Sequence, residues 1–143
     1  MKNRFSFILC TFFILLSHTT FSQEDKKVTV KIESKVVEDQ IQLKAVVANN
    51  TSIYAELNYL LISIKKGNGG NLSNNKQSGK FSINPNEVKV LSEINVNLEK
   101  KDALKAFLYV KDEETQKLIA KDSLELNGDL FRKKIAGIEE DVF

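Results

Sequence analysis

Apolar and polar residues alternate along most of the chain after residue 27, and this pattern limits the fold more than any other feature of the sequence. A period of two places one set of side chains on one face of a β-strand, whereas a helix needs a period near 3.6. Segments that alternate in this way, or are apolar on both parities, are residues 28–33, 41–47, 54–66, 81–83, 88–98, 104–110 and 118–126. No helical pattern precedes Asn127. The sequence therefore predicts an all-β protein, an immunoglobulin-like antiparallel β-sandwich of about seven strands.

Turn-forming residues separate the predicted strands. Glu38 and Asp39 lie between the first two segments and predict a hairpin turn. Residues 67–79 contain four glycines and four asparagines, which predicts a long loop. The segment 54–66 is apolar on both parities, so we expect a strand that is central in its sheet or covered on both sides.

The N-terminus has the order of a secretory signal peptide, with basic Lys2 and Arg4 followed by an apolar run over residues 5–16 and then small polar residues. The run is shorter than the roughly 20 residues that a membrane-spanning helix needs, so an uncleaved anchor is the weaker interpretation. We expect cleavage before Gln23. The chain would then comprise a signal peptide (1–22), a sandwich domain (23–126) and a C-terminal tail (127–143). We expect the product to be periplasmic, or alternatively extracellular, without stable membrane insertion.

Loss of the signal peptide would also remove most of the reactive side chains. The only cysteine, Cys10, and the only histidine, His18, lie within it. Catalytic triads and dyads and most zinc sites depend on these residue types, so we expect no catalytic residues, no metal site, no cofactor and no enzymatic activity. The full chain has a formal net charge of +2. Removal of Lys2 and Arg4 leaves equal numbers of basic and acidic residues, which gives no reason to expect nucleic-acid binding.

Aromatic residues on one predicted strand indicate a binding surface. If the even-numbered residues of 104–110 face the core, Phe107 and Tyr109 point outward between Lys105 and Lys111. Such a surface could bind extended peptides, and lysines on strands also hinder aggregation of the protein itself. The alternative is that the tail or the long loop covers these aromatic residues. Tyr59 and Leu61 present the same choice on the segment 54–66, and the full set of candidate client-binding residues is Tyr59, Leu61, Lys105, Phe107, Tyr109 and Lys111.

The tail, residues 127–143, differs in pattern from the rest of the chain. Its apolar residues could line one side of a short helix; they are Leu130, Phe131, Ile135, Ile138 and Val142. Gly137 weakens the helical prediction. The tail either docks on the sandwich, which we prefer, or binds a partner.

The central part of the sequence resembles a known family. The features that carry this resemblance are the strand and glycine at 59–67, the turn and strand at 77–81, the turn at 84–87, and the strands at 106–110 and 118–126. Together they resemble the CsgH/CsgC family of curli-assembly factors over roughly residues 28–126. The resemblance implies a monomeric periplasmic chaperone whose partner is a curli-like amyloid subunit, kept from premature polymerisation. CsgC-type members carry a Cys-x-Cys pair that this chain lacks after cleavage, so the CsgH-like branch fits better.

Two other functions are compatible with the same residues. The protein could be an extracytoplasmic adhesin or carbohydrate-binding module, with Tyr59, Phe107 or Tyr109 stacking on sugars. It could also be a structural subunit of an envelope or fibre complex, with the tail as the docking segment.

Overall fold

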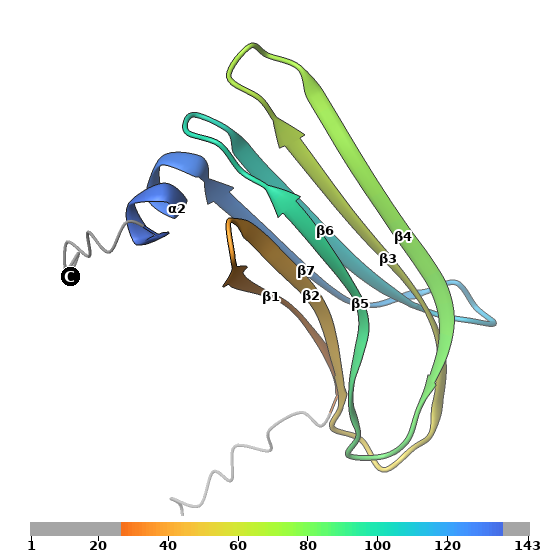
Figure 1. The fold of residues 1–143 in the computed structure, drawn as a ribbon. Helices are drawn as coiled ribbons and strands as arrows, with labels where there is room; N and C mark the ends of the chain where they lie inside the picture. The colour runs from red at the N-terminus through yellow and green to blue at the C-terminus, as the bar shows by residue number, and fades with distance from the viewer. Residues whose placement is uncertain (1–26, 136–143) are drawn as a thin grey trace, which may run out of the picture.

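The computed structural model describes residues 27–135, and side chains as far as Arg132. The predicted signal peptide and the end of the tail lie outside this range. The described elements are β1 (Val28–Val37), β2 (Gln40–Asn49), β3 (Ala55–Lys66), β4 (Leu72–Ile83), β5 (Val88–Asn97), β6 (Ala103–Asp112), β7 (Leu118–Asn127) and α2 (Gly128–Ile135). The strands form a three-stranded sheet, β1-β2-β5, and a four-stranded sheet, β4-β3-β6-β7, and all neighbours are antiparallel (Figure 1). The predicted all-β sandwich is confirmed.

The core lies between the two sheets and follows the predicted alternation. On β2 and β6 every second residue is buried, and Leu43 and Leu108 are completely inaccessible. β3 is central in the four-stranded sheet, as its double apolar pattern predicts. The turn between β1 and β2 consists of Glu38 and Asp39, with Glu38 at a φ of 54°. This hairpin prediction is also confirmed.

Two local predictions are wrong. The long loop predicted over residues 67–79 is only a short turn, because β4 already begins at Leu72. The common parity of Val88, Val90 and Ile94 predicts one shared face, but the pairing of β5 with β2 shifts between Ala45 and Val46. This β-bulge turns Val88 and Val90 to the solvent while Ile94 stays buried.

The two sheets lie close together along β1 and β7, which we call the closed side of the sandwich. Along β4 and β5, which we call the open side, they are joined by side chains. On the closed side, the backbone N–H of Ile32 in β1 donates to Asp122 Oδ2 in β7 over 2.7 Å. On the open side, side chains bridge β4 and β5, since Lys89 Nζ donates to Ser82 O (2.6 Å) and Gln77 Nε2 donates to Glu93 O (3.5 Å). Figure 1 shows the β3–β4 hairpin extending beyond the end of β5 on this side.

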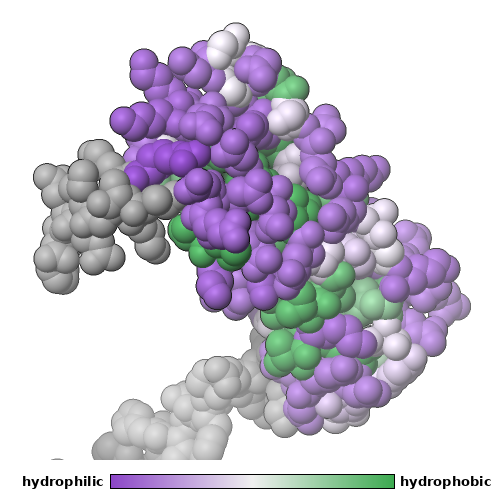
Figure 2. Space-filling view, viewed as in Figure 1, coloured by the Kyte–Doolittle hydropathy of each residue, from purple (hydrophilic) through white to green (hydrophobic). Residues whose placement is uncertain are grey.

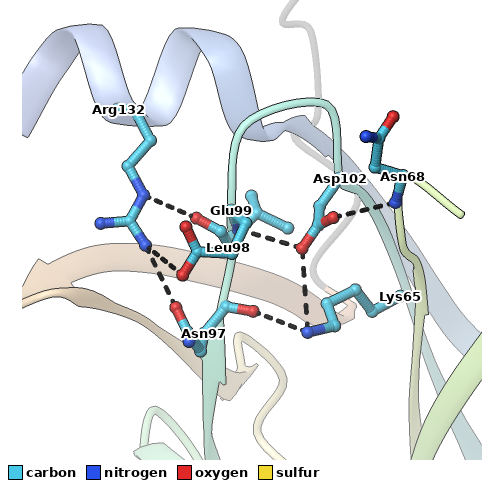
Figure 3. A network of polar contacts seen from close by, with 7 residues as sticks. All are labelled: Lys65, Asn68, Asn97, Leu98, Glu99, Asp102 and Arg132. Atoms are coloured by element: carbon cyan, nitrogen blue, oxygen red, sulfur yellow. Dashed lines mark hydrogen bonds and ion pairs between the residues drawn. The ribbon is translucent and has the colours of Figure 1, made fainter.

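Helix α2 is fixed to one end of the sandwich. Phe131 is buried and joins the main core cluster. Figure 3 shows Arg132 reaching the turn between β5 and β6, where its Nε donates to Leu98 O (2.9 Å) and its guanidinium contacts Glu99 Oε1 (3.1 Å). In the same turn the buried Asp102 accepts a bond from the Glu99 N–H (3.0 Å). A short helix was one expectation for this segment, and α2 docks on its own sandwich.

Candidate binding surface

The outer face of the four-stranded sheet carries two neighbouring rows of apolar side chains. Leu60 of β3 lies opposite Tyr109 of β6, and Ile62 lies opposite Phe107. All four are partly exposed, and Ile64, next along β3, is 37% exposed. We call the surface formed by these five residues the β3–β6 face. The three-stranded sheet packs on the opposite side, and α2 inserts Phe131 into the core instead of covering this face.

Lysines surround the β3–β6 face on the same side of the sheet. They are Lys76 and Lys80 on β4, Lys105 and Lys111 on β6, and Lys121 on β7, which lies opposite Tyr109. Two of them are paired with carboxylates: Lys80 with Glu113 (2.6 Å) and Lys105 with Glu125 (3.4 Å). The hydrogen bond and the charge of Glu113 raise the pKa of Lys80. The other three have no carboxylate within 4.0 Å among residues 27–132, so the border has an excess of positive charge.

A hollow of about 230 Å³ lies beside Tyr109 on this face. Lys76, Lys111, Asn58 and Gln116 are among the residues that line it. Asn58 Oδ1 is buried and accepts no hydrogen bond from the described residues. A bound molecule with a hydroxyl or amide donor would satisfy this oxygen.

The structure brings together four of the six predicted client-binding residues. Lys105, Phe107, Tyr109 and Lys111 share the outer face of β6, as their parity predicts. Leu61 does not belong to the surface, because it is completely buried in the core.

Tyr59 has the same parity as Leu61 and also points inward. The core consists of two clusters, one around Leu61 and one around Val110, and the Tyr59 side chain packs against both. Its ring also meets Phe81 edge-on, with ring centroids 6.3 Å apart. It is therefore wrongly placed by the sequence interpretation. Leu60 and Ile62 take the outward positions, and the sequence carries no signal for this choice, because the strand is apolar on both parities.

The outer face of the three-stranded sheet offers a smaller apolar surface. It consists of Val46, Ala48, Val88 and Val90, of which Val88 is 68% and Val90 51% exposed. Figure 2 shows hydrophobic surface low in the view, where β2 and β5 lie. Lys31 lies opposite Val46 and Lys44 lies two positions before it on β2, but both pair with carboxylates, Lys31 with Glu33 (3.9 Å) and Lys44 with Glu93 (3.0 Å). This patch provides a natural control for experiments on the β3–β6 face.

The carboxylate of Asp112, at the end of β6, accepts hydrogen bonds from residues of the following turn. Asp112 Oδ1 accepts bonds from the Thr115 N–H (2.7 Å) and the Thr115 hydroxyl (2.9 Å), and these bonds lower the pKa of Asp112. Within residues 27–135, no group of three or more His, Cys, Asp or Glu side chains is arranged to hold a metal ion. In the same range no helix has the length and apolar character to cross a membrane.

Comparison with solved structures identifies similar folds. The curli protein CsgC of E. coli matches with a TM-score of 0.56 at 18% identity, over 68% of this chain and 97% of CsgC. CsgH of R. palustris matches with a TM-score of 0.51 at 18% identity, over 72% of this chain and 94% of CsgH. The sequence matches no protein-family model and no curated protein. The CsgC/CsgH-like fold predicted from the sequence is thus confirmed.

The same fold also occurs within a larger enzyme. A calcium-binding mutant of β-glucuronidase 2 from Bacteroides uniformis matches with a TM-score of 0.51 at 13% identity. The match covers 68% of this chain but only 13% of the enzyme, so it concerns one small part of that protein. Nothing about the enzyme's activity follows for this chain.

Proposed function

We propose that this protein is an exported, curli-related chaperone that delays amyloid polymerisation of a curli-like subunit by binding it transiently through the β3–β6 face. The observation that carries the proposal is an apolar and aromatic surface bordered by lysines, on a fold shared with a curli protein. The signal-like N-terminus supports action in the periplasm. The proposal is one of binding without catalysis.

The composition of the β3–β6 face is suited to weak and reversible binding. Partly exposed Phe107, Tyr109, Leu60 and Ile62 offer apolar area to a β-prone segment, at roughly 25 cal/mol per Å² that becomes buried. The bordering lysines favour encounter with acidic segments, but exposed ion pairs contribute only about 0–1 kcal/mol each. A client would therefore be captured and released, and would not be held in a permanent complex.

The test is the lag time of curli-subunit polymerisation, followed by thioflavin fluorescence with the mature protein at substoichiometric amounts. We expect the wild-type protein to lengthen the lag. The double variant Phe107→Ser/Tyr109→Ser should need roughly tenfold more protein for the same delay, because two aromatic contacts are lost.

The matched control is Val88→Ser/Val90→Ser, which makes the same kind of change on the outer face of the other sheet. It should inhibit as well as the wild type. An unchanged lag with wild-type protein would remove the proposed function. Equal losses in the two double variants would remove the β3–β6 face as the binding surface.

One observation favours a second candidate, a carbohydrate-binding module. The hollow beside Tyr109 combines an aromatic ring with amide and lysine side chains and the unpartnered Asn58 Oδ1. Sugar-binding sites combine aromatic stacking on the sugar ring with hydrogen bonds to its hydroxyl groups. A glycan array with wild-type protein and Tyr109→Ser would detect it, and an array without signal argues against it.

A further inference from the structure

The first half of β4 is accessible from three directions. Residues 72–76 are exposed on both parities, unlike any other run of this length within a described strand. β4 pairs only with β3, so its other edge is free. The cross-bridges to β5 begin at Gln77, beyond this segment. Both faces and one edge of residues 72–76 are therefore available.

The other edges of the sandwich are partly closed by side chains. β1 and β7 lie against each other, and the backbone N–H of Ile32 donates its hydrogen bond to the carboxylate of Asp122. On β5, Gln77 binds the backbone oxygen of Glu93, and Lys65 Nζ donates to the backbone oxygen of Asn97 (3.0 Å). A strand that approaches these edges would have to displace these contacts.

The side chains on the free edge have the chemistry of amyloid ladders. Ser73, Asn74 and Asn75 all have hydroxyl or amide side chains. Asparagine and glutamine in neighbouring strands stack their amides in ladders of hydrogen bonds, which add to backbone pairing. Lys76 follows these residues at the end of the free segment, and it would place like charges close together if two copies of the protein paired through β4 around this position. The edge thus favours a foreign amide-rich strand over a second copy of itself.

We propose that residues 72–76 of β4 bind an extended, Asn/Gln-rich segment of the amyloid subunit as a fifth strand of the four-stranded sheet. This inference rests on the proposed function and deepens it, because it names the client segment and its mode of binding. The segment is held by backbone hydrogen bonds and amide contacts at the edge of β4. The bound client strand then has one of its two edges covered by β4, so it offers one edge fewer to the next subunit.

The first experiment compares Asn74→Lys on β4 with Asn95→Lys on β5 in the polymerisation assay. Both asparagines are exposed residues of edge strands on the open side, and both changes add one positive charge. Asn74→Lys should raise the amount of protein needed for a given delay roughly three- to tenfold, since one amide contact is replaced by an edge lysine. Asn95→Lys should behave as the wild type.

The second experiment measures hydrogen exchange of the backbone amides with a synthetic peptide of alternating asparagine and glutamine as the probe. The peptide should slow exchange within residues 72–76 roughly tenfold near saturation, and leave residues 88–97 unchanged. Because this readout does not involve polymerisation, it tests the edge even if the chaperone function fails.

The outcomes separate the two proposals. If the wild type delays polymerisation but both variants match it and the peptide protects no β4 amide, the edge proposal is overturned and the proposed function stands. If the wild type gives no delay but the peptide protects β4, the edge binds strands and the chaperone function is wrong. Protection that grows with protein concentration without peptide would identify a second copy as the occupant, and would overturn the proposal.

Discussion

The docking of α2 depends on a residue without a side chain at Gly128. A Cβ atom added at this position would lie 1.9 Å from the backbone oxygen of Glu99 and 3.2 Å from that of Asp102. The backbone N–H of Gly128 also donates to Asp102 O over 2.8 Å, which holds the chain close to the turn. Because the obstacle is backbone, it cannot rotate away. We expect Gly128→Ala to displace the start of α2 from the sandwich.

Two effects of opposite sign determine how Gly128→Ala changes the free energy of unfolding. Alanine is more favourable than glycine by about 1 kcal/mol in a helix interior, and because Gly128 is the first residue of α2 this value is the upper limit of the gain from helix propensity. Displacement of α2 removes Phe131 from the core, at a cost of about 1.5–3 kcal/mol. It also breaks the charge-assisted bond from Arg132 to Leu98 O, at a cost of about 1.5 kcal/mol. The two costs together are about 3–4.5 kcal/mol, so we expect a net destabilisation of at least about 2 kcal/mol.

Urea denaturation measures this change directly. With a slope of about 1–3 kcal/mol per molar urea, the midpoint should fall by roughly 1 M. The control is Gly69→Ala, where the added Cβ would lie 3.9 Å from its nearest neighbour, Asn71 Oδ1, and should change the midpoint little. An unchanged or higher midpoint for Gly128→Ala, with the ring signals of Phe131 unshifted, would refute the reasoning.

Two further predictions concern single carboxylates. Asp122→Ala should speed hydrogen exchange at the Ile32 amide, because a partly buried hydrogen bond to a charged acceptor is lost. The free energy of unfolding, measured by urea denaturation, should fall by about 1 kcal/mol. An unchanged exchange rate at the Ile32 amide would contradict this prediction. The pKa of Asp112 should lie below its ordinary value of 3.8 in a carboxyl NMR titration, and Thr115→Val should raise it only in part, because the Thr115 N–H is the larger cause and is retained. Since the folded-state pKa is lowered, this stabilisation is present above the ordinary pKa and is lost as the pH falls through the folded-state value; a pKa of 3.8 or higher would contradict the geometry.

The alternation of apolar residues was sufficient to predict most strands and their inner faces. On β2 and β6 one face packs against the second sheet and the other meets water, so burial alone determines the parity. The outward placement of Phe107 and Tyr109 followed from the same rule. Two of the five residues of the β3–β6 face could therefore be derived before the fold was known.

The rest of the surface depends on tertiary arrangement. Residues 72–79 form a strand although they show no apolar alternation, because an edge strand exposed on both faces has nothing to bury and its pairing partner β3 supplies the hydrogen bonds. Tyr59 and Leu60 lie on a strand that is apolar on both parities, so their directions depend on which side the second sheet covers. Leu91 is the extra residue of the bulge in β5, so residues before and after it have opposite inward parities, and this bulge arises only from the pairing of β5 with β2.

The free edge and the β3–β6 face belong to one continuous surface. Lys76 lies opposite Ile62, Ile62 opposite Phe107, and Phe107 opposite Ser123, so one row of side chains crosses all four strands. A strand added to β4 would lie about 4.8 Å from it and would place its own outward side chains next in this row. The added strand would lie three strand spacings, about 14 Å, from β6, so a client contacts Phe107 only if its apolar residues before or after the paired part turn back across β4 and β3. Such a complex would cover one edge of the client strand, which leaves the client fewer edges at which a fibre can grow.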